Sequence, residues 1–391
     1  MDILEELQQL YLFKIDKVDK VDELDSRLWR GSFSGRESTL QQLSPYVGKM
    51  KSGMARALIK IFTEPNDIIL DPFSGSGVVP LEALLANRIA FANDLSPYAY
   101  VLTRGKLEAP ASEKVAIKNT LAILDEIIGF APKITLSSVP QWVKEFYHPD
   151  TLRETLATFK VLMNKQNYFL MACLLGILHH VRPGFLSFPA SHLVPYLRKA
   201  KYPVETFPWM YEYRDVKSRL VAKVKRAYKR TLIPDNWDSR NYKLWNTNSM
   251  QLPIDDNQID AIISSPPYFG ALDYARDNRL RLWFLGHKDW KKIDETLTAN
   301  GKIYLPQMAI CLKEIYRVLK PGKYCILVLG DVERNGKTKK TAEILSELAV
   351  NVTDGKLIID KVYDDIIPDE RRSRRRTTTT KFERILVMHK I

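Results

Sequence analysis

The sequence predicts an α/β fold, in which a mostly parallel, doubly wound sheet of seven strands ends in an antiparallel hairpin and carries a mainly helical inserted domain. Short apolar runs of strand length alternate with helical patterns in two separate parts of the chain. A loop with two glycines joins the first apolar run, residues 68–70, to a helix, and a second strand then ends at Asp94. Between about residues 110 and 241 the alternation stops.

The successive elements follow from these patterns. Apolar residues recur at helical spacing over residues 1–28, 48–62, 78–86, 111–128, 151–180, 217–230, 272–285, 304–319 and 339–350. Compact apolar runs predict strands over residues 68–70, 89–92, 242–245, 259–263, 324–329, 357–362 and 383–389, of which the last two form the hairpin. The expected organisation is an N-terminal helical arm (1–44), a sheet domain in two parts (45–109 and 242–391) and the inserted helical domain (110–241).

The composition is that of an ordinary globular protein. Hydrophobic residues make up 45% and charged residues 27% of the 391 positions, which excludes a disordered tail, a collagen or a coiled coil. The longest apolar run, residues 169–178, is about half as long as a membrane span. The acidic N-terminus has no apolar signal core. We therefore expect a cytoplasmic protein that does not contact a membrane.

Basic residues outnumber acidic ones by 59 to 46, which gives a formal net charge of +13. This excess favours a polyanionic partner, with nucleic acid as the first candidate, although a generically basic enzyme would show the same charge. The three cysteines, Cys173, Cys311 and Cys325, share no metal-ligand spacing. The pair His179-His180 has no suitably spaced acid or cysteine. No metal site is predicted.

The loop after the first strand, Asp71-Pro72-Phe73-Ser74-Gly75-Ser76-Gly77, has the features of a ligand-binding turn. Its two glycines allow a tight turn and a close approach of the backbone to a ligand. Asp94, at the end of the second strand, can accept both hydroxyl hydrogens of a ribose. Val78 and Val79 stand where a nucleoside-triphosphate loop would place Lys and Ser or Thr, which excludes that class. The loop resembles motif I of the amino-methyltransferases that use S-adenosylmethionine.

A second motif, Ser264-Ser265-Pro266-Pro267-Tyr268, caps the predicted strand 259–263. The carboxyl ends of parallel strands share one edge of a sheet, so we expect this motif beside the glycine loop. The two prolines stiffen the backbone, and its carbonyls and Ser265 supply hydrogen-bond acceptors. Tyr268 offers a flat stacking face. This set suits the exocyclic amine of a flipped-out base, although a proline-stiffened turn with a buried tyrosine would contain the same residues.

With both motifs, the chain resembles the DNA amino-methyltransferases, and Ser-Pro-Pro-Tyr is similar to the cytosine-N4 type. Residues 45–50 resemble the segment over the methionine part of the cofactor. Residues 246–249 resemble the adenine-side segment, in which the family usually has an acid where Ser249 stands. The resemblance implies a catalytic role for Ser265, Pro266, Pro267 and Tyr268. It implies S-adenosyl-L-methionine contacts at Tyr46, Lys49, Asp71, Pro72, Phe73, Ser74, Gly75, Gly77, Asp94, Leu95, Asn248, Ser249 and Ser264.

The implied reaction is site-specific methylation of cytosine N4 in double-stranded DNA by direct displacement, within a restriction-modification system that has a cognate restriction endonuclease as a further partner. Arginine suits phosphate oxygens, so expected DNA contacts are Arg276, Arg279, Arg371, Arg372, Arg374, Arg375 and Arg376. A solvated loop is the alternative for the last five. Methylation of cytosine C5 is excluded because no cysteine follows a proline in a loop. Adenine-N6 methylation, guanine-N2 methylation of RNA and non-enzymatic DNA binding remain alternatives.

Overall fold

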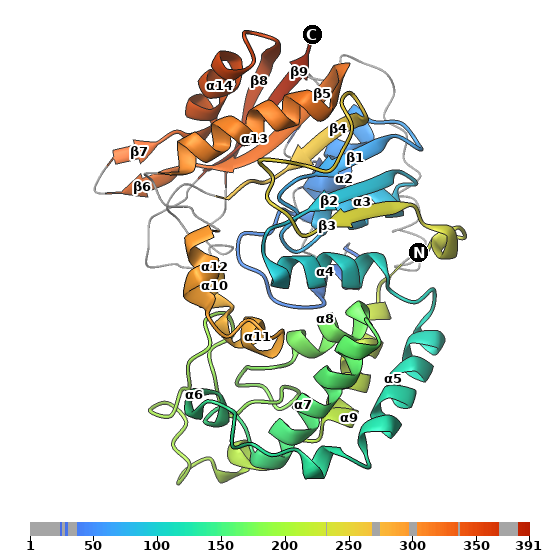
Figure 1. Cartoon of the computed structure of the whole chain (residues 1–391), viewed down its shortest axis with the longest axis vertical. Coiled ribbons are helices and arrows are strands. Elements are labelled where there is room, and N and C mark those ends of the chain that lie inside the picture. The colour runs from blue at the N-terminus through green and yellow to red at the C-terminus, as the bar shows by residue number, and fades with distance from the viewer. Residues whose placement is uncertain are drawn as a thin grey trace.

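The computed structural model describes residues 24–25, 28–29, 37–231, 233–267, 274–296, 303–334, 337–366 and 382–391. Within these ranges seven strands form one sheet in the order β3-β2-β1-β4-β5-β9-β8, and β6 and β7 form a separate small hairpin (Figure 1). β9 runs antiparallel to both β5 and β8, and the other neighbours are parallel. The predicted seven-stranded, mostly parallel sheet with a terminal hairpin is therefore confirmed.

The bounds of β1–β4 and β9 lie close to the predicted ones, whereas β5 begins earlier and β8 ends later than predicted, and β6 and β7 had no predicted counterpart. The strands are β1 (Ile68–Asp71), β2 (Ile89–Asn93), β3 (Tyr242–Trp245), β4 (Ile259–Ser264), β5 (Leu319–Gly330), β6 (Val332–Arg334), β7 (Lys337–Lys339), β8 (Leu357–Ile366) and β9 (Phe382–Lys390). Every residue of β4 is buried, as expected for a central strand that is covered on both faces.

Helices cover both faces of the sheet and create two apolar cores. One core contains α2 (Ser52–Phe62), α3 (Val78–Leu85) and α4 (Pro97–Leu107), and the other contains α13 (Tyr304–Val318) and α14 (Thr341–Val352). This two-sided cover is what makes the sheet doubly wound. It leaves the carboxyl ends of β1, β2 and β4 as the edge at which loops can meet.

The chain between β2 and β3 is mainly helical. After α4 it forms α5 (Glu113–Ile127), α6 (Gln141–Lys144), α7 (Pro149–Asn164), α8 (Tyr168–Gly176) and α9 (Val216–Tyr228). These helices make up the lower body in Figure 1 and continue the core of α2–α4. A Cβ atom on Gly105 of α4 would lie 2.6 Å from the carbonyl oxygen of Tyr168, so glycine permits the close contact of α4 with α8.

Three short helices follow β4 and lie between the sheet and the lower body. They are α10 (Tyr274–Asp277), α11 (Arg279–Phe284) and α12 (Trp290–Thr296) (Figure 1). The single helix predicted over residues 272–285 is therefore wrong, because residues 274–285 contain two short helices separated at Asn278. No described helix has the length and apolar character needed to cross a bilayer.

One further predicted helix differs from the structure, and helix α4 (Pro97–Leu107) had no predicted counterpart. The single helix predicted over residues 151–180 is two helices, because Gln166 adopts a left-handed φ of 51° and the Asn167 side chain caps α8 by accepting the N–H of Leu170. Helix α4 was not predicted, although Ser96-Pro97 is a favourable helix start. Of the predicted arm, residues 1–44, the helical part over residues 1–28 lies almost entirely outside the described residues, and residues 37–44 contain one short 3₁₀ turn (Thr39–Gln42).

Candidate functional site

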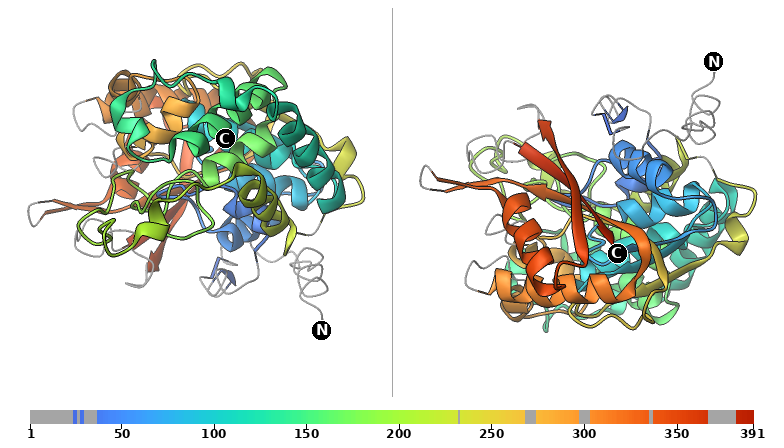
Figure 2. Two further views of the ribbon diagram at one scale, coloured as in Figure 1. Left: turned by 90° about the horizontal axis from the view of Figure 1, so that it is seen from below. Right: turned by 90° about the horizontal axis from the view of Figure 1, so that it is seen from above.

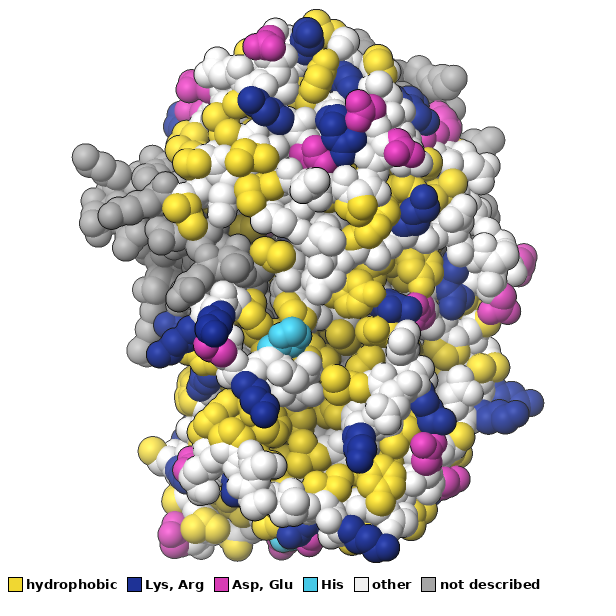
Figure 3. Space-filling model, viewed as in Figure 1, with side chains coloured by type: hydrophobic (Ala, Val, Ile, Leu, Met, Phe, Trp, Pro, Cys, Tyr) yellow, Lys and Arg dark blue, Asp and Glu magenta, His cyan; other side chains and the backbone are white. Residues whose placement is uncertain are grey.

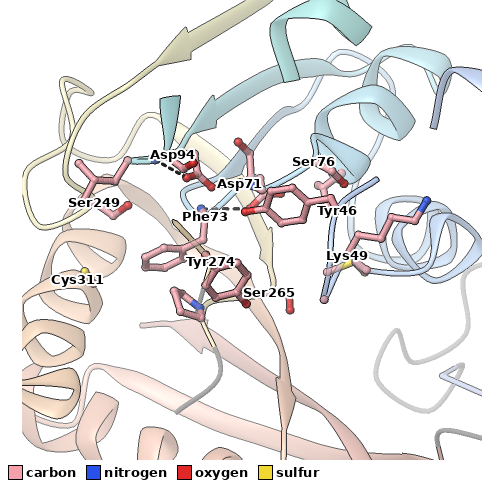
Figure 4. A pocket seen from close by; sticks show the side chains of 18 of the residues that line it. Tyr46, Lys49, Asp71, Phe73, Ser76, Asp94, Ser249, Ser265, Tyr274 and Cys311 are labelled. Carbon is pink, nitrogen blue, oxygen red and sulfur yellow. Dashed lines mark hydrogen bonds between the residues drawn. The ribbon is translucent and has the colours of Figure 1, made fainter. Parts of the chain in front are cut away.

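A pocket lies at the carboxyl ends of β1, β2 and β4, where the two sequence motifs meet (Figure 4). It contains about 1080 Å³ of empty space, part of which is open solvent. The predicted site residues among those that line it are Tyr46, Lys49, Asp71, Phe73, Ser74, Gly75, Asp94, Leu95, Asn248, Ser249, Ser265 and Pro267. The structure therefore brings together residues from the segments before α2, after β1, after β2, after β3 and after β4.

Asp94 holds the glycine loop to the end of β2. Its Oδ2 accepts the N–H of Gly75 at 2.7 Å, and its Oδ1 accepts the N–H of Ser96 at 2.8 Å. Burial raises the pKa of this carboxyl to about 6, and the two backbone N–H groups oppose the rise. Each carboxylate oxygen keeps further acceptor capacity. Asp94 can therefore position the loop and still accept hydrogen bonds from a ligand at neutral pH.

A second carboxyl, that of Asp71, joins β1 to β4. Its Oδ1 accepts the hydroxyl of Ser264 at 2.5 Å and the N–H of Phe73 at 3.3 Å. Burial raises the pKa of Asp71 to about 7, and the hydrogen bond from Ser264 opposes the rise. Ser264 thus supports the pocket wall through Asp71, since it does not itself line the pocket.

Asn93, which no motif in the sequence marks, connects the loops after β1, β2 and β3 around the pocket. Its side-chain N–H groups donate to the Thr247 carbonyl and to Oγ of Ser249, both at 3.0 Å, and its Oδ1 accepts the N–H of Thr247 at 3.1 Å. The Ser249 hydroxyl in turn donates to the Pro72 carbonyl at 2.6 Å. The hydrogen of Ser249 is therefore committed to the backbone, and Ser249 links the loops after β1 and β3.

Aromatic rings form one wall of the pocket. The Tyr46 ring stacks on Tyr98 at a centroid distance of 5.9 Å and lies 6.1 Å from the Tyr274 ring. A Cβ atom on Gly75 would lie 3.2 Å from Tyr46 Cε1, so the loop approaches this ring more closely than a side chain would comfortably allow. Lys49 extends away from Asp71 and Asp94 (Figure 4), and its Nζ donates to the Gln41 carbonyl at 3.3 Å.

The end of β4 contributes the second motif. The Ser265 hydroxyl donates to the Val328 carbonyl of β5 at 3.0 Å, so its oxygen lone pairs stay available as acceptors. Ser265 and Pro267 both line the pocket. Tyr268, the predicted stacking residue, lies outside the described residues.

Helix α13 supplies a part of the wall that was not predicted. Tyr304, Gln307, Met308 and Cys311 follow one face of its first turns and line the pocket beside Phe73 and Ser249. Their helical spacing identifies a common face but not its neighbour. Tyr274 on α10 was also missed, because it follows the motif by several residues and no local pattern marks it.

Of the seven arginines predicted to contact DNA, only Arg276 and Arg279 lie within the described residues. Arg276 is about half exposed on α10, and a guanidinium N–H of Arg279 donates to the Pro195 carbonyl. The five arginines between residues 371 and 376 lie outside the described residues.

The three cysteines are free and buried, and burial raises the pKa of Cys311 to about 12. No group of three His, Cys, Asp or Glu side chains suited to a metal ion occurs in the described ranges.

The likeness of this chain to solved structures is distant. TrmN from Thermus thermophilus aligns with 91% of this chain at 10% identity and a TM-score of 0.34, and the chain spans 53% of that protein. An S-adenosylmethionine-dependent methyltransferase from Methanosarcina mazei aligns with 85% of this chain at 12% identity and a TM-score of 0.33, over 97% of its own length. At these TM-scores neither likeness bears on the function of this chain.

No curated protein matches the sequence at a significant level. Residues 11–103 match a protein family, N6_N4_Mtase, that is described as DNA methylase. The matched segment contains β1, the glycine loop, β2 and Asp94. This part of the chain is therefore similar to the DNA methylases.

Proposed function

We propose that this chain is a site-specific DNA methyltransferase that transfers the methyl group of S-adenosyl-L-methionine to the exocyclic N4 amine of a flipped-out cytosine in duplex DNA. The observation that carries the proposal is the single pocket in which Asp94, the glycine loop and Ser265 meet. A ribose acceptor and an acceptor for an amine therefore face the same space. The match of residues 11–103 to DNA methylases supports DNA as the substrate.

The described residues fit a cofactor of this kind. Gly75 has a left-handed φ of 50°, which favours glycine, and the absence of a Cβ lets the backbone of the loop approach a ligand in the pocket. The carboxylate of Asp94 would accept the ribose hydroxyls. Tyr46, Lys49, Phe73, Leu95, Asn248 and Ser249 would surround the remainder. When bound, the cofactor supplies an electrophilic methyl group.

The residues after β4 would orient the target amine. Ser265 already donates its hydrogen to Val328, so its oxygen would accept a hydrogen bond from the NH₂ group. The rigid Pro266-Pro267 segment would add a backbone carbonyl as a second acceptor. Two acceptors favour a pyramidal nitrogen, and alignment supplies the entropic part of the rate enhancement. In this proposal the amine nitrogen would attack the methyl carbon directly, with the thioether of the spent cofactor as the leaving group and one N–H proton of the amine released. The enzyme would form no covalent intermediate.

The states of the cysteines support amine methylation over C5 chemistry. A C5 reaction needs a thiolate nucleophile next to the base. Cys311 lines the pocket, but burial raises its pKa to about 12, and Cys173 lies in the buried helix α8. Cys325 is buried within β5. The described residues thus offer acceptors for an amine, and no cysteine among them is activated as a nucleophile.

The proposal extends to the setting of the enzyme. The inserted helices between β2 and β3 would recognise the DNA site, with the sheet domain before and after them carrying the chemistry. The chain would act in a restriction-modification system beside a cognate restriction endonuclease, in the cytoplasm. Arg276, Arg279 and the arginines between residues 371 and 376 would contact phosphates.

Mass spectrometry of nucleosides tests the reaction. Duplex DNA is incubated with the protein and S-adenosylmethionine and then digested. We expect N4-methylcytosine from the parental chain, much less from Ser265→Ala, and the parental amount from Ser239→Ala, which removes an exposed hydroxyl outside the pocket. N6-methyladenine would keep the reaction class but change the base. Absence of any methylated deoxynucleoside, or methylation of RNA instead, would overturn the proposal.

A further inference from the structure

The chain between α8 and α9 is a long loop, residues 177–215, and its backbone is extensively hydrogen-bonded. It contains one short 3₁₀ turn (Pro208–Tyr211) and one isolated bridge, Ala190 to Leu197. Around that bridge the N–H of Ser191 donates to the Tyr196 carbonyl, and the N–H of Arg198 donates to the Pro189 carbonyl, both at 2.9 Å. The segment therefore holds a defined tight turn although it has no helix or strand of its own.

A buried arginine holds the two arms of the loop together. The guanidinium of Arg214, which is 5% exposed, donates to the carbonyls of Phe185 at 3.0 Å and Met210 at 2.9 Å. Burial lowers the pKa of Arg214 to about 10, so the group still carries its charge at neutral pH. Carbonyls, not carboxylates, receive its hydrogens here. The loop is thus organised before any partner binds, which reduces the entropy lost on binding.

The outer surface of this loop combines cations with aromatic rings. Tyr196 is 50% and Trp209 58% exposed, and Lys199 and Lys201 are also exposed. The guanidinium of Arg198 lies 6.0 Å from the Tyr196 ring centroid. Residues 177–215 contain five Lys or Arg and three acids, Glu205, Glu212 and Asp215, and three of the five cations lie within residues 198–201. No ion pair to Arg182, Arg198, Lys199 or Lys201 occurs within the described part of the chain.

The loop also touches the helices that follow the second motif. Arg279 on α11 donates to the Pro195 carbonyl at the tip of the tight turn. In both views of Figure 2 the yellow-green loops lie on the side of the molecule away from α13, the same side as the end of β8. The opposite face, seen in Figure 3, shows its lysines and arginines scattered among apolar and uncharged side chains. The tip of the loop, with its cations at residues 198–201, is therefore connected through Arg279 to the helices that follow the second motif.

We infer that the loop of residues 177–215 is the part of the inserted domain that contacts duplex DNA, with Lys199 and Lys201 on phosphates and Trp209 on the sugar or base edges. The inference rests on the proposed function. Uncompensated cations favour a phosphate backbone over a protein partner. Exposed aromatic rings in the same loop suit sugars and bases, and the contact from Arg279 connects the loop to α11, which follows the second motif.

Paired lysine substitutions test the phosphate contacts. The affinity of a duplex for Lys199→Ala/Lys201→Ala is measured against salt concentration and compared with Lys114→Ala/Lys118→Ala, which removes two exposed lysines from α5. The slope of log affinity against log salt should fall by about 1.8 for two lost contacts, at about 0.9 each. The α5 variant should keep the parental slope. Thermal unfolding and cofactor affinity should be unchanged in both variants.

A substitution that removes no charge tests the aromatic contact separately. Trp209→Ala should weaken duplex binding severalfold and leave the salt slope unchanged, because no phosphate contact is lost. A parental slope for the Lys199/Lys201 variant, or an equal fall for the α5 variant, would overturn the inference while the methylation result stands. If the parental chain binds no duplex and methylates no DNA, the proposed function itself fails. If Trp209→Ala binds the duplex as tightly as the parental chain does, Trp209 does not contact the DNA.

Discussion

Replacement of Asp94 by alanine is the sharpest test of the cofactor site. The change removes the carboxylate that accepts the Gly75 and Ser96 N–H groups at 2.7 and 2.8 Å, and with it the proposed ribose acceptor. A hydrogen bond to a charged group contributes about 1.5–3 kcal/mol. The loss of one such bond to the ribose corresponds to a Kd for S-adenosylmethionine that is about 10- to 150-fold higher.

The pH dependence gives an independent measure of the same group. Burial raises the pKa of Asp94 to about 6, so the carboxyl is ionised at neutral pH and becomes protonated as the pH falls through 6. Protonation replaces an acceptor by an O–H group, and the parental Kd should therefore rise about fivefold between pH 6 and pH 5 beyond any change in the variant. Asp71, with a pKa raised to about 7 by burial, titrates in both proteins, and because the charge of Asp94 contributes to that rise, the pKa of Asp71 should be lower in the variant.

Isothermal titration with S-adenosylmethionine at several pH values is the assay. Asp238→Ala, which removes an exposed acid outside the pocket, is the matched control and should bind as the parent does. Duplex affinity should be nearly unchanged in the Asp94 variant, since the phosphate contacts lie elsewhere. An unchanged Kd for Asp94→Ala would refute the ribose assignment. Parallel pH profiles for parent and variant would refute the assignment of the titration to Asp94.

Three further predictions concern other parts of the molecule. Gly77→Ala should lower the unfolding temperature more than Gly355→Ala. Both glycines have a φ of 74°, at which an alanine is strained by about 1–2 kcal/mol. Only at Gly77 would the added Cβ also clash with another atom, Thr103 Cα at 2.7 Å. Tyr268→Ala should lose a stacking face worth about 1–3 kcal/mol and most of the methylation activity, whereas Tyr268→Phe should keep most of that activity. Equal methylation rates for the alanine variant and the parent would contradict the stacking role. Replacement of all five arginines between residues 371 and 376 by alanine should weaken binding of every duplex about equally and leave the preferred DNA sequence unchanged. The slope of log affinity against log salt should fall by about 0.9 per lost contact. A changed sequence preference would place part of the recognition element in the C-terminal hairpin.

Local sequence patterns were sufficient to predict most strands of the sheet. An apolar run closed by Asp71, a glycine loop and a second strand ending before Asp94 are signals within about 25 residues, and the strands they predict are present. The order of the two motifs along parallel strands was also sufficient to predict that Gly75 and Ser265 meet at one edge, as they do. Helix ends were predicted less well, because a single left-handed residue such as Gln166 ends a helix without changing the apolar spacing.

Sequence alone thus determined the fold class, the number of strands in the sheet and the residues of the two motifs, because each depends on neighbours in the chain. Tertiary structure decided which distant side chains complete the pocket. Asn93 reaches Thr247 and Ser249 across more than 150 residues, and the face of α13 that carries Met308 and Cys311 meets the pocket only because α13 packs on that side of the sheet. Spacing identifies the face that a helix presents, but packing of the whole chain selects what that face touches.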